Sequence, residues 1–193
     1  MKKIIFATSN PNKLEELKAI CKDLTDIEFI LPPKGFNPLE NGSTFEENSL
    51  IKAREAARIG KVPALADDSG LCVDALNGAP GIHSARYAGT PQKRIEKLLN
   101  MMKKEENRTA KFVCAMTLVD AEGNILCQKT GECRGKIDYA CKGSHGFGYD
   151  PIFIVDTKDA TMAELDEDEK NKISHRAKAL EQIIFYLNSH QMS

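Results

Sequence analysis

The sequence has neither an excess of one charge nor a long apolar run. Lysine and arginine number 27 and aspartate and glutamate 28, so the chain lacks the broad basic surface of proteins that coat nucleic acids, and any phosphate binding must be local. The apolar run Ile4–Ala7 is too short for the h-region of a signal peptide. We therefore expect a cytoplasmic protein that binds neither nucleic acid nor a membrane.

Metal-binding cysteine pairs and the dinucleotide-binding glycine motif are also missing. None of the six cysteines forms a CxxC pair or has zinc-finger spacing, and most lie inside apolar runs. We expect them to be small core residues in a reducing compartment. Without a GxGxxG motif, no dinucleotide-binding fold is indicated.

The order of apolar patterns predicts an α/β protein with a mixed sheet. With 193 residues, of which 41% are hydrophobic, the chain fits one domain over 1–193 with a sizeable core. The expected strands are 2–8, 27–31, a short strand that runs into Asp67 and Asp68, a long hairpin over 109–137, and a strand after 146. The expected helices are 11–24, 48–59, one that opens at Thr90-Pro91, and a C-terminal helix containing Ala177 and Leu187.

The segment Ala7–Lys13 connects the first strand to the first helix. Asn10 is a good N-cap and Pro11 suits the first helical position, so an ordinary strand-to-helix turn explains the pattern. Exposed amides at a helix N-terminus, two hydroxyls and Lys13 also suit a cradle for a phosphate chain. The local pattern leaves both interpretations open.

Acidic side chains follow an apolar strand at Asp67-Asp68-Ser69-Gly70. Carboxylates and a hydroxyl at a strand's carboxyl end suit Mg²⁺, which prefers oxygen ligands, but the same four residues are common in turns. Glu40, in the loop before Thr44, is by itself a surface glutamate. It becomes a candidate ligand only if the fold brings it beside Asp68.

Two later segments carry further candidate binding groups. Glycines around Phe147 and Tyr149 favour close approach to a planar ligand, although a β-bulge with a core phenylalanine explains them equally. Ser174 is a plausible N-cap, which places His175 and Arg176 at the helix end that disfavours cations. A partner with acceptor atoms or negative charge would offset that cost.

Six segments together resemble the inosine triphosphate pyrophosphatase family, also called the Ham1-like or RdgB-like family. The segments are TSNPNK (8–13), TFEENSLIKA (44–53), ADDSGL (66–71), GAPGIHSARYAG (78–89), GFGYDPIF (146–153) and KNKISHR (170–176). They occur in family order and span nearly the whole chain, which favours the phosphate-cradle interpretation of the first turn. The resemblance implies an elongated mixed sheet with flanking helices and two lobes around a central nucleotide-binding cleft.

The resemblance also implies an activity and a set of site residues. The activity is Mg²⁺-dependent hydrolysis of ITP, dITP and XTP, non-standard purine nucleotides, to the monophosphate and pyrophosphate by a homodimer. Asp68 is then the proton acceptor, and Glu40 and Asp68 bind one or more Mg²⁺ per subunit. The residues expected to bind substrate are Thr8, Ser9, Asn10, Pro11, Asn12, Lys13, Ser69, Phe147, Gly148, Tyr149, Asp150, Lys170, His175 and Arg176.

Within that set, the resemblance divides the nucleotide among the residues. Thr8–Lys13, with Ser69 and Lys170, would bind the triphosphate, and Lys52 is a weaker phosphate candidate. Phe147–Asp150 would hold the base, while His175 and Arg176 donate to its 6-keto oxygen and N7. Adenine presents an amino group at position 6, which would leave buried donors unpaired, so ATP should be a poor substrate.

Two other functions remain open at this point. A nucleotide sensor would keep the cradle and the base pocket without turnover, although it has no need of a water-activating carboxylate. A metal-dependent phosphatase acting on the γ-phosphate would release orthophosphate instead of pyrophosphate. The reaction products distinguish all three.

Overall fold

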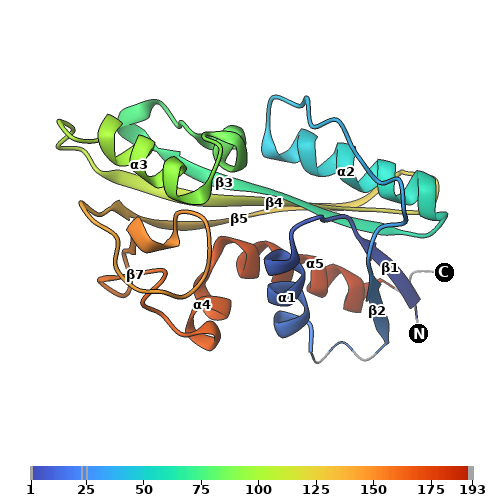
Figure 1. Cartoon of the computed structure of the whole chain (residues 1–193). Helices are drawn as coiled ribbons and strands as arrows, with labels where there is room; N and C mark the ends of the chain where they lie inside the picture. Colours follow the sequence, from blue (N-terminus) through green and yellow to red (C-terminus); the bar gives the residue numbers. More distant parts are fainter. Residues whose placement is uncertain (1, 23, 25, 191–193) are drawn as a thin grey trace. The chain divides into compact units, whose positions relative to one another are not determined.

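The computed structural model describes residues 2–22, 24 and 26–190, in which seven strands form one mixed sheet (Figure 1). The strand order is β2-β1-β3-β4-β5-β6-β7. The strands are β1 (Lys2–Phe6), β2 (Ile27–Ile30), β3 (Ala64–Val73), β4 (Thr109–Val119), β5 (Ile125–Ile137), β6 (Phe153–Val155) and β7 (Ala160–Thr161). Because β1 runs parallel to β2 and β3 while β6 runs antiparallel to β5 and β7, the predicted mixed α/β class is confirmed.

Helices separate and follow these strands. The α-helices are α1 (Pro11–Ile20), α2 (Phe45–Gly60), α3 (Pro91–Met101), α4 (Glu167–Ile173) and α5 (His175–Ser189). The short 3₁₀ helices are η1 (Asp74–Leu76), η2 (Gly81–Arg86) and η3 (Asp150–Ile152). In the described part of the chain, no helix combines the length and the apolar character needed to cross a membrane.

The described residues fall into two compact units. The first unit takes residues from 1–68, 114–131 and 176–193, and the second takes 69–113 and 132–175. The long strands β3, β4 and β5 contribute residues to both units. The single domain over 1–193 and the cleft expected between two lobes stay predictions.

Three of the predicted helices begin directly after a capping side chain, and α2 begins at Phe45, three residues before the predicted 48. The side chain of Asn10 accepts a hydrogen bond from the Asn12 amide at 3.0 Å. Thr44 and Thr90 likewise accept backbone N–H groups from the third residue of α2 and α3, at 3.1 and 3.2 Å. These bonds satisfy amides that have no partner inside the helix, so the capping residues indicate in the sequence where each helix starts. Helix α1 ends at Ile20, four residues before the predicted Leu24.

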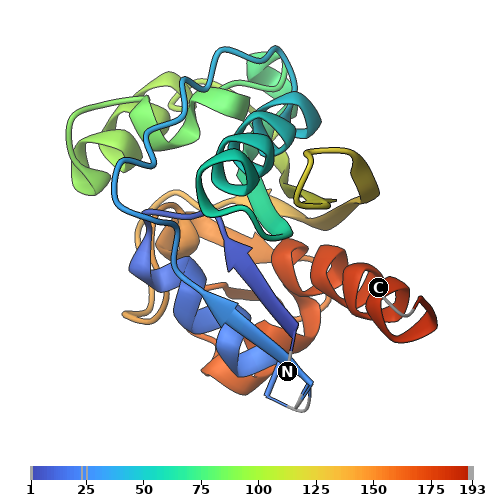
Figure 2. The ribbon, with the colours of Figure 1, turned by 90° about the vertical axis from the view of Figure 1, so that its right-hand side faces the viewer.

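The core of the first unit lies on two faces of the sheet. Helix α2 covers one face of β3 and β4, and α1 and α5 cover the other (Figure 1). Figure 2 shows β1 and β2 side by side, with α1 next to them. Successive strand residues alternate between these faces, as Ile4 packs with the α1 and α5 residues and Ile5 with the α2 residues.

Gly60 closes α2 against the sheet. A Cβ at this position would overlap with the Cδ1 atom of Ile5, so a larger residue would require this side chain to move. The left-handed residue that terminates the helix is Lys61, with φ 55°. The predicted helix end is confirmed, and close packing onto β1, not a left-handed conformation, accounts for the glycine.

Strand β3 is longer than predicted. It continues through Asp67, Asp68 and Gly70 to Val73, so the interpretation of these residues as an ordinary turn is wrong. Both carboxylates are nearly buried, and each is paired with cations from distant segments. Because those partners lie far away in sequence, the local residue types resembled a turn.

The second unit has its own apolar core. It is built from the end of β3, α3, the start of β4, the end of β5 and β6. The rings of Phe112 and Phe153 lie 4.5 Å apart between centroids. The six cysteines, all in the described part of the chain, are free, and Cys21, Cys114, Cys127 and Cys133 are buried as expected. Cys72 is half-buried and Cys141 is exposed, so the expectation of a core position is wrong for Cys141.

Candidate functional site

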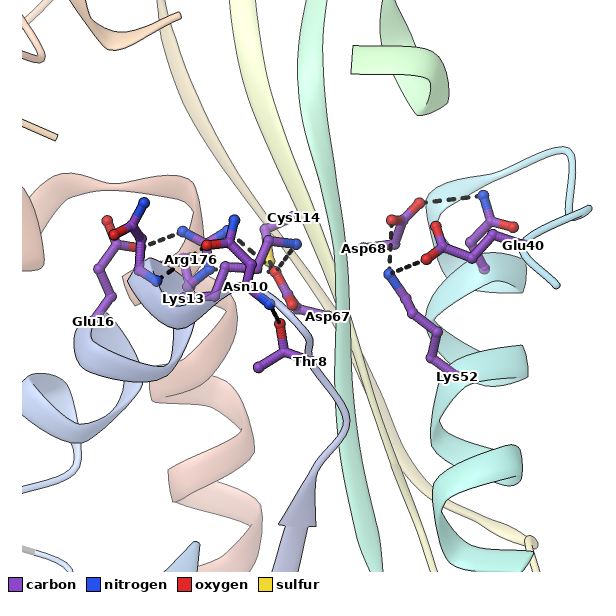
Figure 3. Close-up of polar contacts among 12 residues, drawn as sticks. Thr8, Asn10, Lys13, Glu16, Glu40, Lys52, Asp67, Asp68, Cys114 and Arg176 are labelled. Atoms are coloured by element: carbon purple, nitrogen blue, oxygen red, sulfur yellow. Dashed lines mark hydrogen bonds and ion pairs between the residues drawn. The ribbon is translucent and has the colours of Figure 1, made fainter. Parts of the chain in front are cut away.

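Two neighbouring acids on β3 point to opposite faces of the sheet. Figure 3 shows Asp67 directed toward α1 and α5, and Asp68 directed toward α2 and the loop that carries Glu40. This follows from the strand's alternation, because Asp67 shares its face with Leu65 and Asp68 shares its face with Ala66. Each acid therefore has its own set of partners.

The Asp68 cluster consists of Glu40, Asn48, Lys52 and Asp68. The Lys52 Nζ atom lies 3.0 Å from Asp68 Oδ1 and 3.5 Å from Glu40 Oε1. The Asn48 amide donates to Asp68 Oδ2 at 3.2 Å, and its oxygen accepts the Gly42 N–H at 2.9 Å. Asn48 thus holds both Asp68 and the loop before α2, so that Glu40 and Asp68 meet at one lysine.

Burial governs the proton affinity of this cluster. It raises the pKa of Asp68 above the ordinary value for a carboxyl, and Lys52 only partly offsets that effect. Burial works to lower the pKa of Lys52, but Asp68, Asp67 and Glu40 together raise it above its usual value. The lysine therefore stays cationic, while Asp68 is a stronger proton acceptor than an exposed aspartate.

The donor set suits a hard divalent cation. The Lys52 ammonium already occupies a position where two carboxylates favour positive charge, and it acts as a stand-in for a bound cation. Among the described residues, no group of three or more His, Cys, Asp or Glu side chains is arranged to hold a metal. Mg²⁺ commonly binds through one or two carboxylates together with phosphate oxygens and water, so the pair fits a cation shared with a bound phosphate.

The Asp67 cluster, on the opposite face, consists of Lys13, Glu16, Asp67 and Arg176. The Asp67 Oδ2 atom lies 2.9 Å from Lys13 Nζ and 3.1 Å from Arg176 Nη2. The guanidinium also donates to Glu16, which lies 160 residues away in sequence. Asp67 and Arg176 are 1% and 2% exposed, so burial would be costly without these charge-assisted bonds.

The pKa of Asp67 is held below its usual value. Burial alone would raise it, but Lys13, Arg176 and Lys52 lower it by more. A depressed folded-state pKa contributes stability that is fully present above the unfolded value of 3.8 and is lost as pH falls below it.

We expect Asp67→Asn to reveal this linkage in acid. At neutral pH the variant should have a lower free energy of unfolding than the wild type, because Lys13 and Arg176 lose their carboxylate. The difference in the free energy of unfolding should narrow as pH falls below 3.8, where the stability that the depressed pKa of Asp67 gives the wild type begins to be lost. Urea unfolding at a series of pH values measures it, and a difference independent of pH would contradict the assignment.

The predicted phosphate cradle leads from the end of β1 into α1. The Thr8 hydroxyl accepts the Asn10 N–H at 3.1 Å, and Asn10 caps the helix. Ser9, Pro11 and Asn12 are exposed, whereas Lys13 is partly buried against Asp67. The segment therefore has an ordered backbone with accessible residues, and its lysine is held by a buried carboxylate.

The Phe147–Asp150 segment belongs to the second unit. Asp150 Oδ2 accepts the Phe147 N–H at 2.9 Å and pairs with Lys170 Nζ at 3.0 Å. Lys170 Nζ also lies 4.8 Å from the centroid of the Phe147 ring. Gly146 and Gly148 have φ of 73° and 66°, and a Cβ at Gly146 would collide with the Asp150 carboxylate. These contacts fix a compact segment that leaves Phe147 half-buried and Tyr149 buried.

His175 packs in the second unit, and the next residue, Arg176, belongs to the first unit. Its ring stacks on Phe112, with centroids 4.9 Å apart and planes 14° apart. Ser69, on the second-unit part of β3, is partly buried.

The candidate residues divide between the two units. Thr8–Lys13, Glu40, Asp68 and Arg176 belong to the first, and Ser69, Phe147–Asp150, Lys170 and His175 belong to the second. The Arg176 guanidinium contacts Asp67 and Glu16, and its role at a base edge stays a prediction.

Sequence reasoning treated Asp67 only as a candidate Mg²⁺ ligand beside Asp68, and it missed Glu16 and Asn48. Asp67 directly follows the apolar run that ends in Ala66, and an acid buried at that position needs a cation as its partner. Nothing in the local pattern marked Glu16 or Asn48.

The sequence matches the Ham1 family over residues 4–186. The chain belongs to the Ham1 family. This Ham1 chain is 48% identical over 176 residues to a dITP/XTP pyrophosphatase of Nostoc sp., a match covering 91% of this chain and 89% of the relative. It is 46% identical to a dITP/XTP pyrophosphatase of Bacillus subtilis, covering 95% of this chain and 96% of the relative. The structure of a HAM1 protein from Coxiella burnetii superposes with a TM-score of 0.90 at 44% identity, covering 98% of this chain and all of that one. The predicted family and fold are confirmed.

Proposed function

We propose that this Ham1 chain hydrolyses ITP, dITP and XTP to the monophosphate and pyrophosphate, with Mg²⁺ as cofactor, and so removes deaminated purines from the nucleotide pool. The observation that carries the proposal is the meeting of Glu40 and Asp68 at Lys52, in a chain whose Nostoc and Bacillus relatives are named dITP/XTP pyrophosphatases. Two carboxylates and a lysine suit chemistry at a phosphate.

The triphosphate is assigned to Thr8–Lys13 of the first unit, with Ser69 and Lys170 of the second assisting. The Thr8–Lys13 segment offers a capped helix N-terminus and a lysine, both of which favour phosphate oxygens. Glu40 and Asp68 would hold Mg²⁺, which neutralises phosphate charge and lowers the pKa of a nearby water. Lys52, which lies beside both acids, would supply a positive charge to the phosphate chain.

Asp68 is assigned the proton transfer. Its raised pKa suits a carboxylate that takes a proton from the attacking water. The water attacks the α-phosphorus in line with the bond to the bridging oxygen, and the electron pair of that bond leaves with pyrophosphate. Lys13 and Lys52 stabilise the negative charge that develops on the leaving group.

The second unit is assigned the base. Phe147 offers an aromatic face, and the Asp150–Lys170 pair keeps its backbone in place. His175, and Arg176 of the first unit, are proposed to donate to the 6-keto oxygen and N7 of the base. Adenine has a donor at position 6, so the same arrangement should make ATP a poor substrate.

Identifying the products of ITP hydrolysis with Mg²⁺ tests the proposal. IMP and pyrophosphate in equal amounts are the expected result, and chelation of the metal should abolish the reaction. IDP and orthophosphate would instead indicate a phosphatase acting on the γ-phosphate. Tight binding of ITP without any product would indicate a sensor.

We also propose that the protein works as a cytoplasmic homodimer. Light scattering of the purified chain tests the dimer, and a monomer mass at working concentration would contradict it.

A further inference from the structure

Ser84 lies at a buried junction of three bonds in the second unit. It belongs to η2, within the GAPGIHSARYAG segment, to which the proposed function gives no role. Its hydroxyl accepts the Leu71 N–H at 2.9 Å and donates to the Gly81 carbonyl at 2.7 Å. Its own carbonyl accepts the hydroxyl proton of Tyr149 at 3.1 Å.

These bonds connect two elements that carry proposed binding residues. Leu71 lies on β3 two residues after Ser69, and Tyr149 lies within the Phe147–Asp150 segment. Leu71, Ser84 and Tyr149 are 0%, 6% and 4% exposed, so water does not compete for the bonds. A bond that is broken here leaves a buried polar group without its partner.

The Tyr149 hydroxyl is a permanent donor. Burial raises its pKa to about 12, so the proton stays on the oxygen at physiological pH. The ring is buried in the core of the second unit and therefore offers no open face for stacking. Within its segment, Phe147 is the half-buried aromatic residue, and Tyr149 acts as the anchor beneath it.

We propose that Ser84 is a positioning residue for the purine base, which holds the Phe147–Asp150 segment to the β3 strand through the Tyr149 hydroxyl. This inference rests on the proposed function, because it assigns the base to that segment. Ser84 touches no substrate. It acts by keeping Phe147 and Asp150 in the arrangement that binds the base, and so it sets the KM for a purine nucleotide with little effect on the chemical step.

Kinetics of Tyr149→Phe and Ser84→Ala test the link. Each variant should raise the KM for ITP about fivefold and change kcat less than about twofold, because Tyr149→Phe removes one buried hydrogen bond and Ser84→Ala removes two, all outside the reacting groups. The KM of the double variant should be no higher than that of the more impaired single variant, because both changes break the same connection. Ser84→Thr, which keeps the hydroxyl, should restore the KM. Inhibition by inorganic triphosphate, which has no base, should be unchanged in every variant.

Tyr139→Phe is the matched control, since the Tyr139 side chain is 75% exposed and removal of its hydroxyl should leave KM unaltered. If Tyr149→Phe and Ser84→Ala lower the melting temperature but leave the KM for ITP unchanged, the residues are only structural and the proposal is wrong. Additive effects in the double variant would also overturn it.

A second readout separates this inference from the proposed function. Failure of the proposed function appears as the absence of pyrophosphate with the wild-type protein. The link is then judged from calorimetric ITP binding and from hydrogen exchange of the Phe147–Asp150 amides. Weaker binding and faster exchange in Tyr149→Phe and Ser84→Ala, but not in Tyr139→Phe, support the link, and unchanged binding refutes it.

Discussion

Replacing Asp68 with asparagine should lower kcat for ITP hydrolysis by about 10³-fold or more, while ITP binding is largely retained. Asparagine cannot accept the proton of the attacking water, and it leaves Glu40 as the one carboxylate at Lys52 in the described cluster. The phosphate cradle at Thr8–Lys13 is untouched by the change. Pyrophosphate release measures turnover, and calorimetry measures binding.

The stability of the same variant provides the internal control. Burial raises the pKa of Asp68, so the folded protein gains little from ionising this group, and a neutral asparagine should not lower the melting temperature. Asp67→Asn, one residue away, should lower it because the pKa of Asp67 is depressed. Retained turnover in Asp68→Asn would remove Asp68 as the base, and a large loss of stability would make its kinetics uninformative on that point.

Arg176→Ala should lower the free energy of unfolding by about 3–5 kcal/mol, the usual cost of removing one partner from a buried ionic network. Its guanidinium is 2% exposed and contacts Asp67 and Glu16, so each of these buried carboxylates would lose a cationic partner, although Lys13 would still pair with Asp67. Urea unfolding at neutral pH measures the loss. The exposed Arg58, which pairs with Glu55 on α2, is the matched control, and Arg58→Ala should have no measurable effect.

Arg176→Lys separates the structural role from the proposed role at the base. Lysine keeps the charge but loses the planar fork, so more of the fold's stability should be retained. If Arg176 also reads the base edge, the ratio of kcat/KM for ITP to that for ATP should fall by about tenfold. An unchanged ratio would show that Arg176 supports the fold without selecting the base.

Elements specified by nearby residues could be predicted from the sequence. The N-caps Asn10, Thr44 and Thr90 contact amides two or three residues away, so their effect is visible locally. The hairpin formed by β4 and β5 follows from strand patterning on either side of the turn after Asp120. The order of elements and the mixed sheet followed from these signals.

The environment of the acids could not be predicted in the same way. Asp67 depends on Arg176, 109 residues away, and a local reading of Asp67–Gly70 indicated a turn because it contained no such partner. Lys52 was a weaker phosphate candidate, yet it lies between Glu40 and Asp68 because α2 packs on that face of β3. The family resemblance supplied the roles of Glu40 and Asp68, but not the cluster on the opposite face.

The alternation of β3 has a consequence for insertions and deletions. Removal of a single residue from the strand before Asp67 would exchange the directions of the two carboxylates. Asp67, the partner of Arg176, would then face α2, and Asp68, the proposed proton acceptor, would face α1. Point substitutions have no such effect, because they leave the register intact. Length variation should therefore be poorly tolerated in this strand.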